Sequence, residues 1–378
     1  MEGEMLNYTK VWLLVFISLC YCYSIGKFVP KGIPRLFGVL PIVCLFLVLP
    51  LNLSSIHPVG TFSFFIAWLA NFKLLLFAFG KGPLSSGPSV SLGHFLAVAC
   101  LPIKIQQNPP LKSWEKSQKS QSNGPNKRNP HEKTNPNGQI KENPSPKRPK
   151  KGHKSPLNYA IKGLLFGMLV RVYAYSEHIH PKVILCLHCL YIYLFLEIIL
   201  ALVAVLPRAL MGLELEPQFD EPYLSASLED FWGKRWNLMA SSILRQTVYE
   251  PFIGMATRVI GRKWARLPAI MGTFFVSAIM HELILYYMGC VRITLKMTWF
   301  FLLHGLCLVI EIVLKKALHQ KFQFPRLISG PLAIGFIMVT GDWLLLPPLL
   351  QCKVDIRAFE EYMVVGAFFN DVFRALTF

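Results

Sequence analysis

The chain has 378 residues, of which 53% are hydrophobic and 16% are charged. Soluble globular proteins carry about a quarter charged residues, so this composition excludes an ordinary soluble fold. Repeated apolar runs of about 20 residues instead predict an all-α, polytopic integral membrane protein with about eight or nine transmembrane helices.

The formal net charge of +18 is concentrated in one segment, because residues 104–154 contain 13 Lys and Arg but 3 acidic residues. A basic segment can bind nucleic acid. In a membrane protein, attraction to anionic lipid headgroups and retention on the cytosolic side are commoner roles. We therefore expect membrane lipids as partners and no nucleic acid.

Residues 1–105 are predicted to form a group of N-terminal transmembrane helices. Apolar runs predict spans at Tyr8–Ile25, Gly38–Leu53 and Val59–Phe79. The run Val90–Ile105 is short and broken by a proline, so we expect it to be re-entrant or interfacial rather than spanning.

Residues 106–155 are rich in Pro, Asn, Lys, Ser and Gln and contain few large apolar side chains. Such a segment cannot bury enough surface to offset its ordering entropy, which predicts a disordered basic insertion. Its Lys147–Lys151 run is similar to a nuclear import signal, but in a multi-span protein a solvated cytosolic tail is the preferred interpretation.

Residues 156–378 contain the remaining predicted spans, separated by the polar stretch Pro207–Arg266. The spans are predicted at Leu157–Tyr175, Val183–Leu206, Leu267–Met288, Met297–Val313, Leu327–Leu346 and Arg357–Phe378. If the basic loop after the first span faces the cytosol, the positive-inside rule places every other large basic loop there as well. This requires that Val90–Ile105 does not span.

His281 is a titratable side chain well inside an apolar helix of membrane-spanning length. Ionisable groups at such depth are costly and by default functional, and imidazole is well suited to accept a proton near neutral pH. From the position of His281 alone, a structural histidine that is hydrogen-bonded to a neighbouring helix is an equally good interpretation. Glu282 points about 100° away around the helix and is not expected to be its partner.

The segment Phe231–Asn237, with the sequence FWGKRWN, combines three aromatic rings, two cations and one amide. An interfacial amphipathic segment would explain the rings and the cations. It would not explain the amide of Asn237, and this favours a functional role for the motif.

With these two motifs, the sequence resembles the plant wax synthase-like branch of the membrane-bound O-acyltransferase superfamily. Most of the matching motifs lie in residues 207–290, and the pattern of spans agrees with the family elsewhere. The insertion 106–155 is longer than expected for the family. The motifs that carry it are PRALMGLELEP at 207–217, FDEPYL at 219–224, SLEDFWGKRWNL at 227–238, SILR at 242–245, VYEP at 248–251 and SAIMHEL at 277–283.

The resemblance implies that residues 156–378 form the catalytic core, which transfers a fatty acyl group from acyl-CoA to a lipid alcohol. It implies catalytic roles for His281 and Asn237, acyl-CoA as co-substrate, and neither a cofactor nor a metal. Long-chain fatty alcohol is the default acceptor, while a sterol, diacylglycerol or an acetyl donor stays open. An acyl-CoA site is expected to use Trp232, Lys234, Arg235, Trp236 and Arg245.

Other interpretations remain beside this one. A transporter would predict an internal repeat, and the sequence shows none. The nine cysteines, including Cys186 and Cys189 around His188, lack zinc-site spacing and are expected to be packing residues rather than a disulfide framework. The endoplasmic reticulum membrane is the expected location, and a homo-oligomer is left open.

Overall fold

The computed structural model describes residues 2–85, 91–102, 156–173, 175–211, 216–290, 294–318 and 325–377. Every regular element in these ranges is a helix, which confirms the all-α class. The predicted disordered insertion 106–155 lies outside the described residues. Within them, seven helical stretches are long and apolar enough to cross a membrane: Gly3–Phe28, Ile33–Asn52, Ile56–Ala78, Pro181–Ala209, Arg266–Tyr287, Lys296–Ala317 and Arg326–Gln351.

Two predicted spans, α7 (Pro156–Tyr173) and α16 (Val354–Thr377), are helical but are not among these seven. α16 carries charged side chains from Asp355 to Arg374, which explains its low hydropathy. The short run after residue 90 forms only α5 (Leu92–Cys100), whose nine residues rise about 14 Å and cannot span a bilayer.

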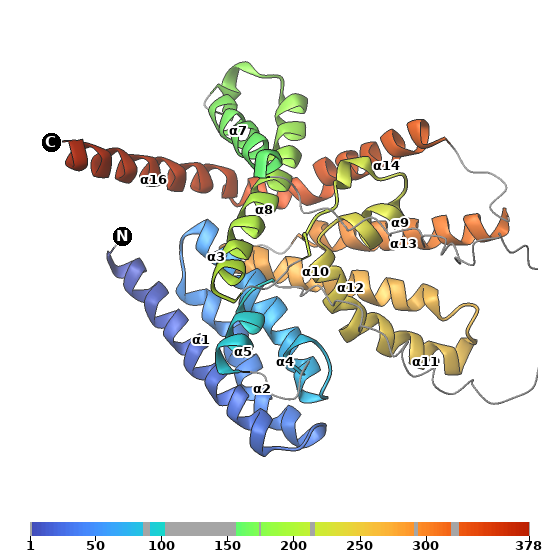
Figure 1. Cartoon of the computed structure of the whole chain (residues 1–378). Coiled ribbons are helices and arrows are strands. Elements are labelled where there is room, and N and C mark those ends of the chain that lie inside the picture. The colour runs from blue at the N-terminus through green and yellow to red at the C-terminus, as the bar shows by residue number, and fades with distance from the viewer. Residues whose placement is uncertain are drawn as a thin grey trace, which may run out of the picture.

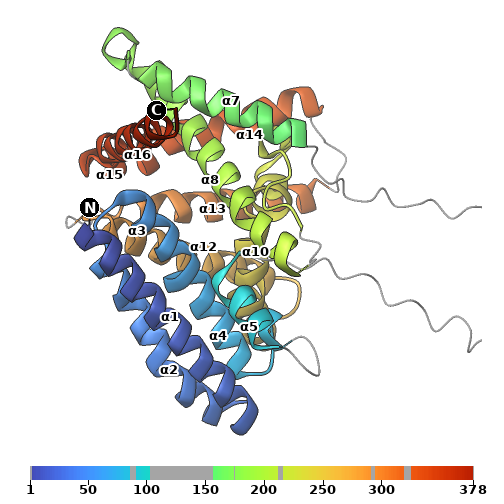
Figure 2. The ribbon, with the colours of Figure 1, turned by 60° about the vertical axis from the view of Figure 1, so that its left-hand side comes forward.

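The N-terminal helices form a bundle at one end of the molecule, with α7 at the other end and α12 and α13 between them (Figures 1 and 2). The bundle comprises α1 (Glu2–Phe28), α2 (Ile33–Val48), α3 (Ile56–Phe62), α4 (Asn71–Ala78) and α5. A π-helical segment, Ser63–Ala70, joins α3 to α4 within one continuous span.

Buried cations in this fold have polar partners from neighbouring helices. Lys73 is fully buried, and its Nζ donates to the carbonyls of Val98 and Leu101, 2.7 and 2.6 Å away at the end of α5. The Lys162 ammonium of α7 lies 2.7 Å from the Glu197 carboxylate of the neighbouring helix. Glu197 is thus paired between helices.

The second half of the chain builds the helices around the two sequence motifs. They are α8 (Pro181–Met211), α9 (Leu228–Asp230), α10 (Leu238–Leu244), α11 (Glu250–Ile260), α12 (Arg266–Tyr287), α13 (Lys296–Ala317), α14 (Arg326–Thr340) and α15 (Leu346–Gln351). α12 and α13 pack against each other, and α12 also packs against the N-terminal bundle, where it contacts α3 and the Ser63–Ala70 segment.

Cys290 and Cys352 form a disulfide, so the expectation that the cysteines serve only packing is wrong for this pair. Cys290 follows the end of α12 and Cys352 follows α15, and both residues lie outside the helices themselves. The predicted topology places both helix ends on the lumenal side. Because disulfides persist in oxidising compartments, the bond agrees with that topology.

We predict that a bulky maleimide will label Cys290 and Cys352 only after both reduction and permeabilisation of microsomes. Labelling can be measured as a gel shift with Cys290→Ser/Cys352→Ser as the blank. A single cysteine introduced as Arg262→Cys, on the predicted cytosolic side, should react in sealed and unreduced vesicles. Labelling of Cys352 in sealed vesicles without reductant would contradict the topology.

Candidate active site

His281 lies on α12, fifteen residues after Arg266 and therefore about 22 Å along the helix axis. Its side chain is half-buried, and its Nδ1 is 2.7 Å from the carbonyl oxygen of Ser277. A carbonyl oxygen only accepts hydrogen bonds, so Nδ1 must carry the hydrogen. In the neutral ring, Nε2 then holds the lone pair that a general base needs.

Aromatic rings surround this imidazole. The ring of Trp68, from the Ser63–Ala70 segment, meets it edge to face with centroids 5.3 Å apart. The ring of Phe301, on α13, lies 4.2 Å away at an interplanar angle of 33°. His281 is thus held between elements of the N-terminal bundle and of the second half of the chain.

Glu282, the neighbour of His281 in sequence, has a structural role. Its Oε1 accepts hydrogen bonds from the backbone amide and the hydroxyl of Thr298, at 3.0 and 3.1 Å. Thr298 lies in the first turn of α13, where backbone N–H groups lack partners within the helix. The carboxylate caps α13, in agreement with the expectation that it does not assist His281.

The half-buried rings of Trp232 and Trp236 pack among other aromatic side chains. Trp232 belongs to the π-helical segment Phe231–Arg235 and contacts Phe301, the ring that also touches His281. Trp236 stacks on Phe231 with centroids 5.2 Å apart. The motif therefore reaches the surroundings of His281 through aromatic contacts.

His304 is a second intramembrane histidine, but both of its nitrogens have partners. Nδ1 accepts a hydrogen bond from the indole N–H of Trp232 at 3.1 Å, and Nε2 lies 2.8 Å from the hydroxyl of Thr340. That hydroxyl donates to the carbonyl of Phe336, so it accepts from His304. A fully buried histidine with neither nitrogen free cannot act as a base in this arrangement.

Asn237 adopts a left-handed backbone conformation with φ of 37° and caps the N-terminus of α10. Its Oδ1 accepts a hydrogen bond from the amide of Ala240 at 3.1 Å. The NH₂ group of the half-buried side chain has no partner among the described residues and is available to a ligand. Ala240 and Trp68 belong to the same buried cluster, so α10 is linked through that cluster to the ring that contacts His281.

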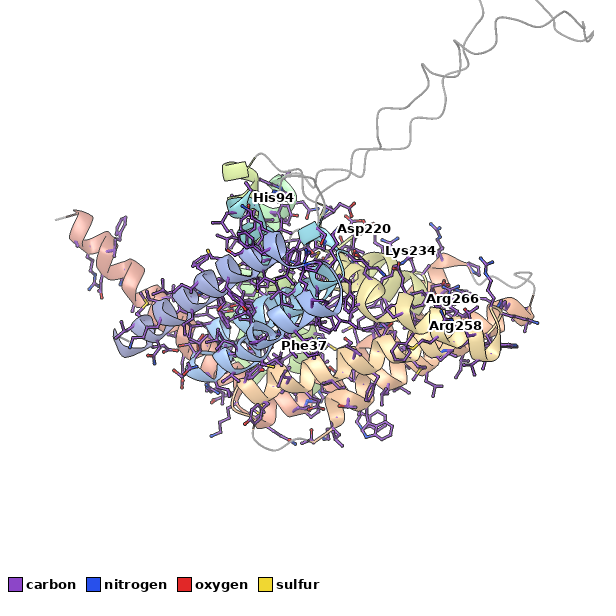
Figure 3. All side chains as sticks on the ribbon, turned by 90° about the horizontal axis from the view of Figure 1, so that it is seen from below. Phe37, His94, Asp220, Lys234, Arg258 and Arg266 are labelled. Atoms are coloured by element: carbon purple, nitrogen blue, oxygen red, sulfur yellow. A yellow bond between two sulfur atoms is a disulfide. The ribbon has the colours of Figure 1, made fainter. Side chains whose placement is uncertain are left out.

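The three expected CoA-binding cations have different environments. Arg235 is fixed within its own loop, with Nε 2.8 Å from the Asp230 carboxylate and Nη1 3.0 Å from the Asp220 carbonyl. The side chains of Lys234 and Arg245 are 72% and 71% exposed, so they are accessible to a soluble anion. Lys234 lies on the same side of the molecule as Arg258 and Arg266 (Figure 3).

A network of ion pairs ties the tryptophan motif to the helices of the site. Glu229 of α9 lies 2.9 Å from Arg266 at the start of α12 and 3.3 Å from Lys315 near the end of α13. Glu311 of α13 pairs with Lys315 at 2.5 Å and accepts from the amide of Leu228 at 3.0 Å. These contacts hold the motif against the α12–α13 pair.

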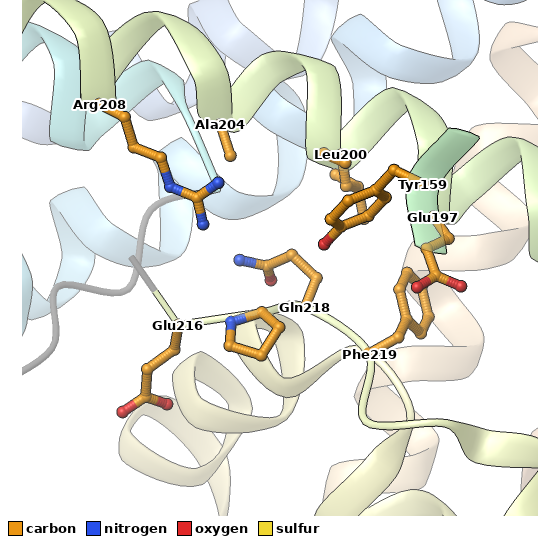
Figure 4. Close-up of a pocket in the computed structure, with 10 residues that line it drawn as sticks. Tyr159, Glu197, Leu200, Ala204, Arg208, Glu216, Gln218 and Phe219 are labelled. Carbon is orange, nitrogen blue, oxygen red and sulfur yellow. The ribbon is translucent and has the colours of Figure 1, made fainter. Parts of the chain in front are cut away.

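A separate small pocket lies between α8 and the segment 216–219 (Figure 4). None of the residues that line it is His281 or belongs to the tryptophan motif. Its floor is nevertheless connected to the motif, because the carbonyl of Gln218 accepts from the amide of Leu238 at 2.8 Å. The lining includes Tyr159, Glu197, Arg208, Glu216, Gln218 and Phe219.

Two residues of the site had no assigned role in the sequence. Trp68 is one of several aromatic residues in the third predicted span, and Phe301 is one of two phenylalanines in the predicted span Met297–Val313. Neither belongs to the motifs, and only the packing of distant helices brings them to His281. An aromatic-rich span face was the one available signal for Trp68.

Comparison with known proteins identifies close relatives. Residues 215–303 match the sequence model of the Membrane bound O-acyl transferase family. Acyl-CoA--sterol O-acyltransferase 1 from Arabidopsis thaliana is 46% identical, over 99% of both chains. The long-chain-alcohol O-fatty-acyltransferase of Simmondsia chinensis is 39% identical over 96% of this chain and 95% of its own. Probable long-chain-alcohol O-fatty-acyltransferase 1 of Arabidopsis thaliana is 40% identical over 97% of each.

The Asp230–Arg235 pair should make the stability of the motif depend on pH. Burial alone would raise the pKa of the Asp230 carboxyl, but hydrogen bonds from Arg235 and the Ala226 amide outweigh it and hold that pKa below its ordinary value. The stabilisation is therefore complete above the ordinary pKa of about 3.9 and is lost as pH falls through the lower pKa of the folded state.

We expect Asp230→Asn to lower the thermal unfolding temperature in detergent at about pH 6, and the difference from wild type to shrink at about pH 3. The exposed Glu250, 3.5 Å from Arg245, supplies a control, since Glu250→Gln should change little at either pH. A wild-type advantage over Asp230→Asn that persists unchanged at low pH would contradict the assignment.

Proposed function

The chain belongs to the plant wax synthase-like branch of the membrane-bound O-acyltransferase family, and we propose that it esterifies a lipid alcohol with the acyl group of acyl-CoA. The observation that carries the proposal is the Nε2 lone pair of His281, which results from the Nδ1–Ser277 hydrogen bond. An alcohol is a poor nucleophile at neutral pH, so a base must remove its proton during attack.

In the proposed reaction, the alcohol gives its proton to Nε2 of His281 while its oxygen attacks the thioester carbonyl carbon. The resulting tetrahedral intermediate carries a negative oxygen. When it collapses, the carbon–sulfur bond breaks and the departing CoA sulfur takes the proton from the imidazolium. The ester and free CoA are formed directly, with no acyl-enzyme intermediate.

Asn237 is proposed to support this step by donating a hydrogen bond to a substrate oxygen. Its Oδ1 is engaged in the cap of α10, so the amide orientation is set and the NH₂ group is the end left for substrate. Donors fixed in advance stabilise developing charge without reorganisation during the reaction. The half-buried position of the side chain keeps this donor accessible.

For the acyl donor, we propose that the exposed Lys234 and Arg245 attract the CoA phosphates. Their exposed side chains remain available to a soluble ligand. Arg235, Trp232 and Trp236 instead shape the motif, since Arg235 holds the loop and the indoles pack inside. In this proposal the two exposed cations attract the CoA phosphates, and the other three residues stabilise the structure of the motif.

The acceptor is proposed to be a long-chain fatty alcohol, as in the names of the Simmondsia relative and several Arabidopsis relatives. A sterol is the second candidate, because the Arabidopsis relative at 46% identity is named a sterol O-acyltransferase. Both acceptors present one hydroxyl on a large apolar body, so the same base serves either.

We further propose that the protein resides in the endoplasmic reticulum membrane. The Cys290–Cys352 disulfide supports one oxidising face, while the Lys- and Arg-rich side, which includes Arg258 and Arg266, supports a cytosolic face. Acyl-CoA would then arrive from the cytosol.

Expression in cells that lack neutral-lipid acyltransferases tests the function directly. Fed with fatty alcohols, sterols or diacylglycerol, cells with the wild type should accumulate one class of new ester, and its identity names the acceptor. His281→Ala should reduce that ester by about 10²–10⁴-fold at equal expression, while His94→Ala, away from the site, should not. Equal ester from wild type and His281→Ala would remove His281 from the mechanism.

Asn237 can be tested by separating its two roles. Asn237→Asp and Asn237→Ser both retain an oxygen that can cap α10, but neither retains the amide NH₂ group. We expect kcat lowered by about 10²–10³-fold in both variants. Thermal stability should stay near wild type for Asp, which tolerates the left-handed backbone at this position, and should fall somewhat for Ser, which does not. Asn237→Ala, which lacks the cap as well, should be both inactive and less stable. Wild-type kcat in the Ser variant would overturn the donor role.

A further inference from the structure

Trp68 is a buried side chain in direct contact with the proposed base. Its relative exposure is 3%, and its ring meets the His281 imidazole edge to face at 5.3 Å. It lies in the π-helical segment Ser63–Ala70, a rare geometry that frequently occurs at functional sites. Trp68 also belongs to a buried cluster with Ala240, Leu244 and Val248, of which Ala240 and Leu244 lie on the helix that Asn237 caps.

The indole nitrogen of Trp68 has no hydrogen-bond partner within the described part of the chain. Buried indole N–H groups usually have one, and a buried donor left unbonded costs about 1–3 kcal/mol. Trp232 shows the usual arrangement, since its N–H donates to His304 at 3.1 Å. A donor that is buried, unbonded and next to the base is therefore suited to a ligand atom.

We propose that the indole N–H of Trp68 donates a hydrogen bond to the thioester carbonyl oxygen of the acyl donor and stabilises the oxyanion that forms there. Trp68 would thus be a catalytic residue contributed by the N-terminal bundle. Together with the NH₂ group of Asn237, it would form a two-donor oxyanion site beside His281.

The chemistry selects the carbonyl oxygen over the alcohol oxygen. The indole can only donate, and a hydrogen bond donated to the attacking alcohol would withdraw electron density from the nucleophile. The carbonyl oxygen gains negative charge in the transition state, so a donor there becomes stronger as the reaction proceeds. A donor in dry, aromatic surroundings is more effective than one in water.

This inference rests on the proposed acyl transfer, and its test begins with a wild type that forms ester. Trp68→Phe removes the N–H and keeps an aromatic ring. We expect kcat to fall by about 10²–10³-fold while KM for acyl-CoA changes by less than about threefold. Trp12→Phe, the same change in α1 away from the site, should leave both constants near wild type.

Two further measurements distinguish lost hydrogen bonding from disturbed packing. S-alkyl-CoA, a thioether that lacks the carbonyl oxygen, should inhibit wild type and Trp68→Phe equally, whereas a packing defect would weaken its binding to the variant. Replacement of Trp68 by β-(3-benzothienyl)alanine exchanges the N–H for sulfur at nearly constant shape. It should lower kcat by the same factor of about 10²–10³, and it supplies the test if Trp68→Phe does not fold.

The outcomes separate the inference from the function. Full kcat in the benzothienyl variant, or a change confined to KM, would overturn the role of Trp68 while leaving the acyltransferase proposal intact. If the wild type forms no ester with any acceptor, the proposed function fails and this role fails with it.

Discussion

The structure depends on one constraint, which is that polar groups inside the hydrocarbon region must find partners within the chain. Lys73 meets the carbonyls at the end of α5, Lys162 meets Glu197, and His304 bonds with both nitrogens. Such pairing is expected where water cannot compensate. Against this background, Nε2 of His281 and the indole nitrogen of Trp68 are informative, because neither has a hydrogen-bond partner among the described residues and their rings are in contact.

The site is assembled from both halves of the chain. Trp68 comes from the N-terminal bundle, His281 and Phe301 come from the α12–α13 pair, and Asn237 comes from the motif between them. Glu229 and its ion pairs hold the motif against that pair of helices. The N-terminal helices therefore do more than anchor a catalytic core, because one of them supplies a wall of the site.

The two ends of the membrane-spanning region have different chemistry. One end carries the disulfide, with Arg357 nearby donating to the carbonyls of Met288 and Ser54 at 2.8 Å each. The other carries the exposed cations of the tryptophan motif and of the start of α12. This asymmetry suits the proposed reaction, in which an anionic donor would arrive from one side and both lipid substrate and product would move within the membrane.

The sequence by itself determined the membrane class, most of the spans and the two motifs, because hydropathy and local motif spacing are properties of neighbouring residues. His281 and His304 both lie within predicted spans, but local information assigns a partner to neither. The tertiary structure distinguished them, since the Ser277 carbonyl leaves Nε2 of His281 free while Trp232 and Thr340 occupy both nitrogens of His304.

Tertiary structure also decided the features that join distant segments. Cys290 and Cys352 pair across two helices, and Trp68 reaches His281 from the third span. Such contacts follow from how helices pack, not from hydropathy or periodicity along the chain, which report only the face that each helix buries. The sequence therefore identified residue types suited to catalysis, and the packing of helices far apart in the chain decided which of their polar atoms have no partner among the described residues.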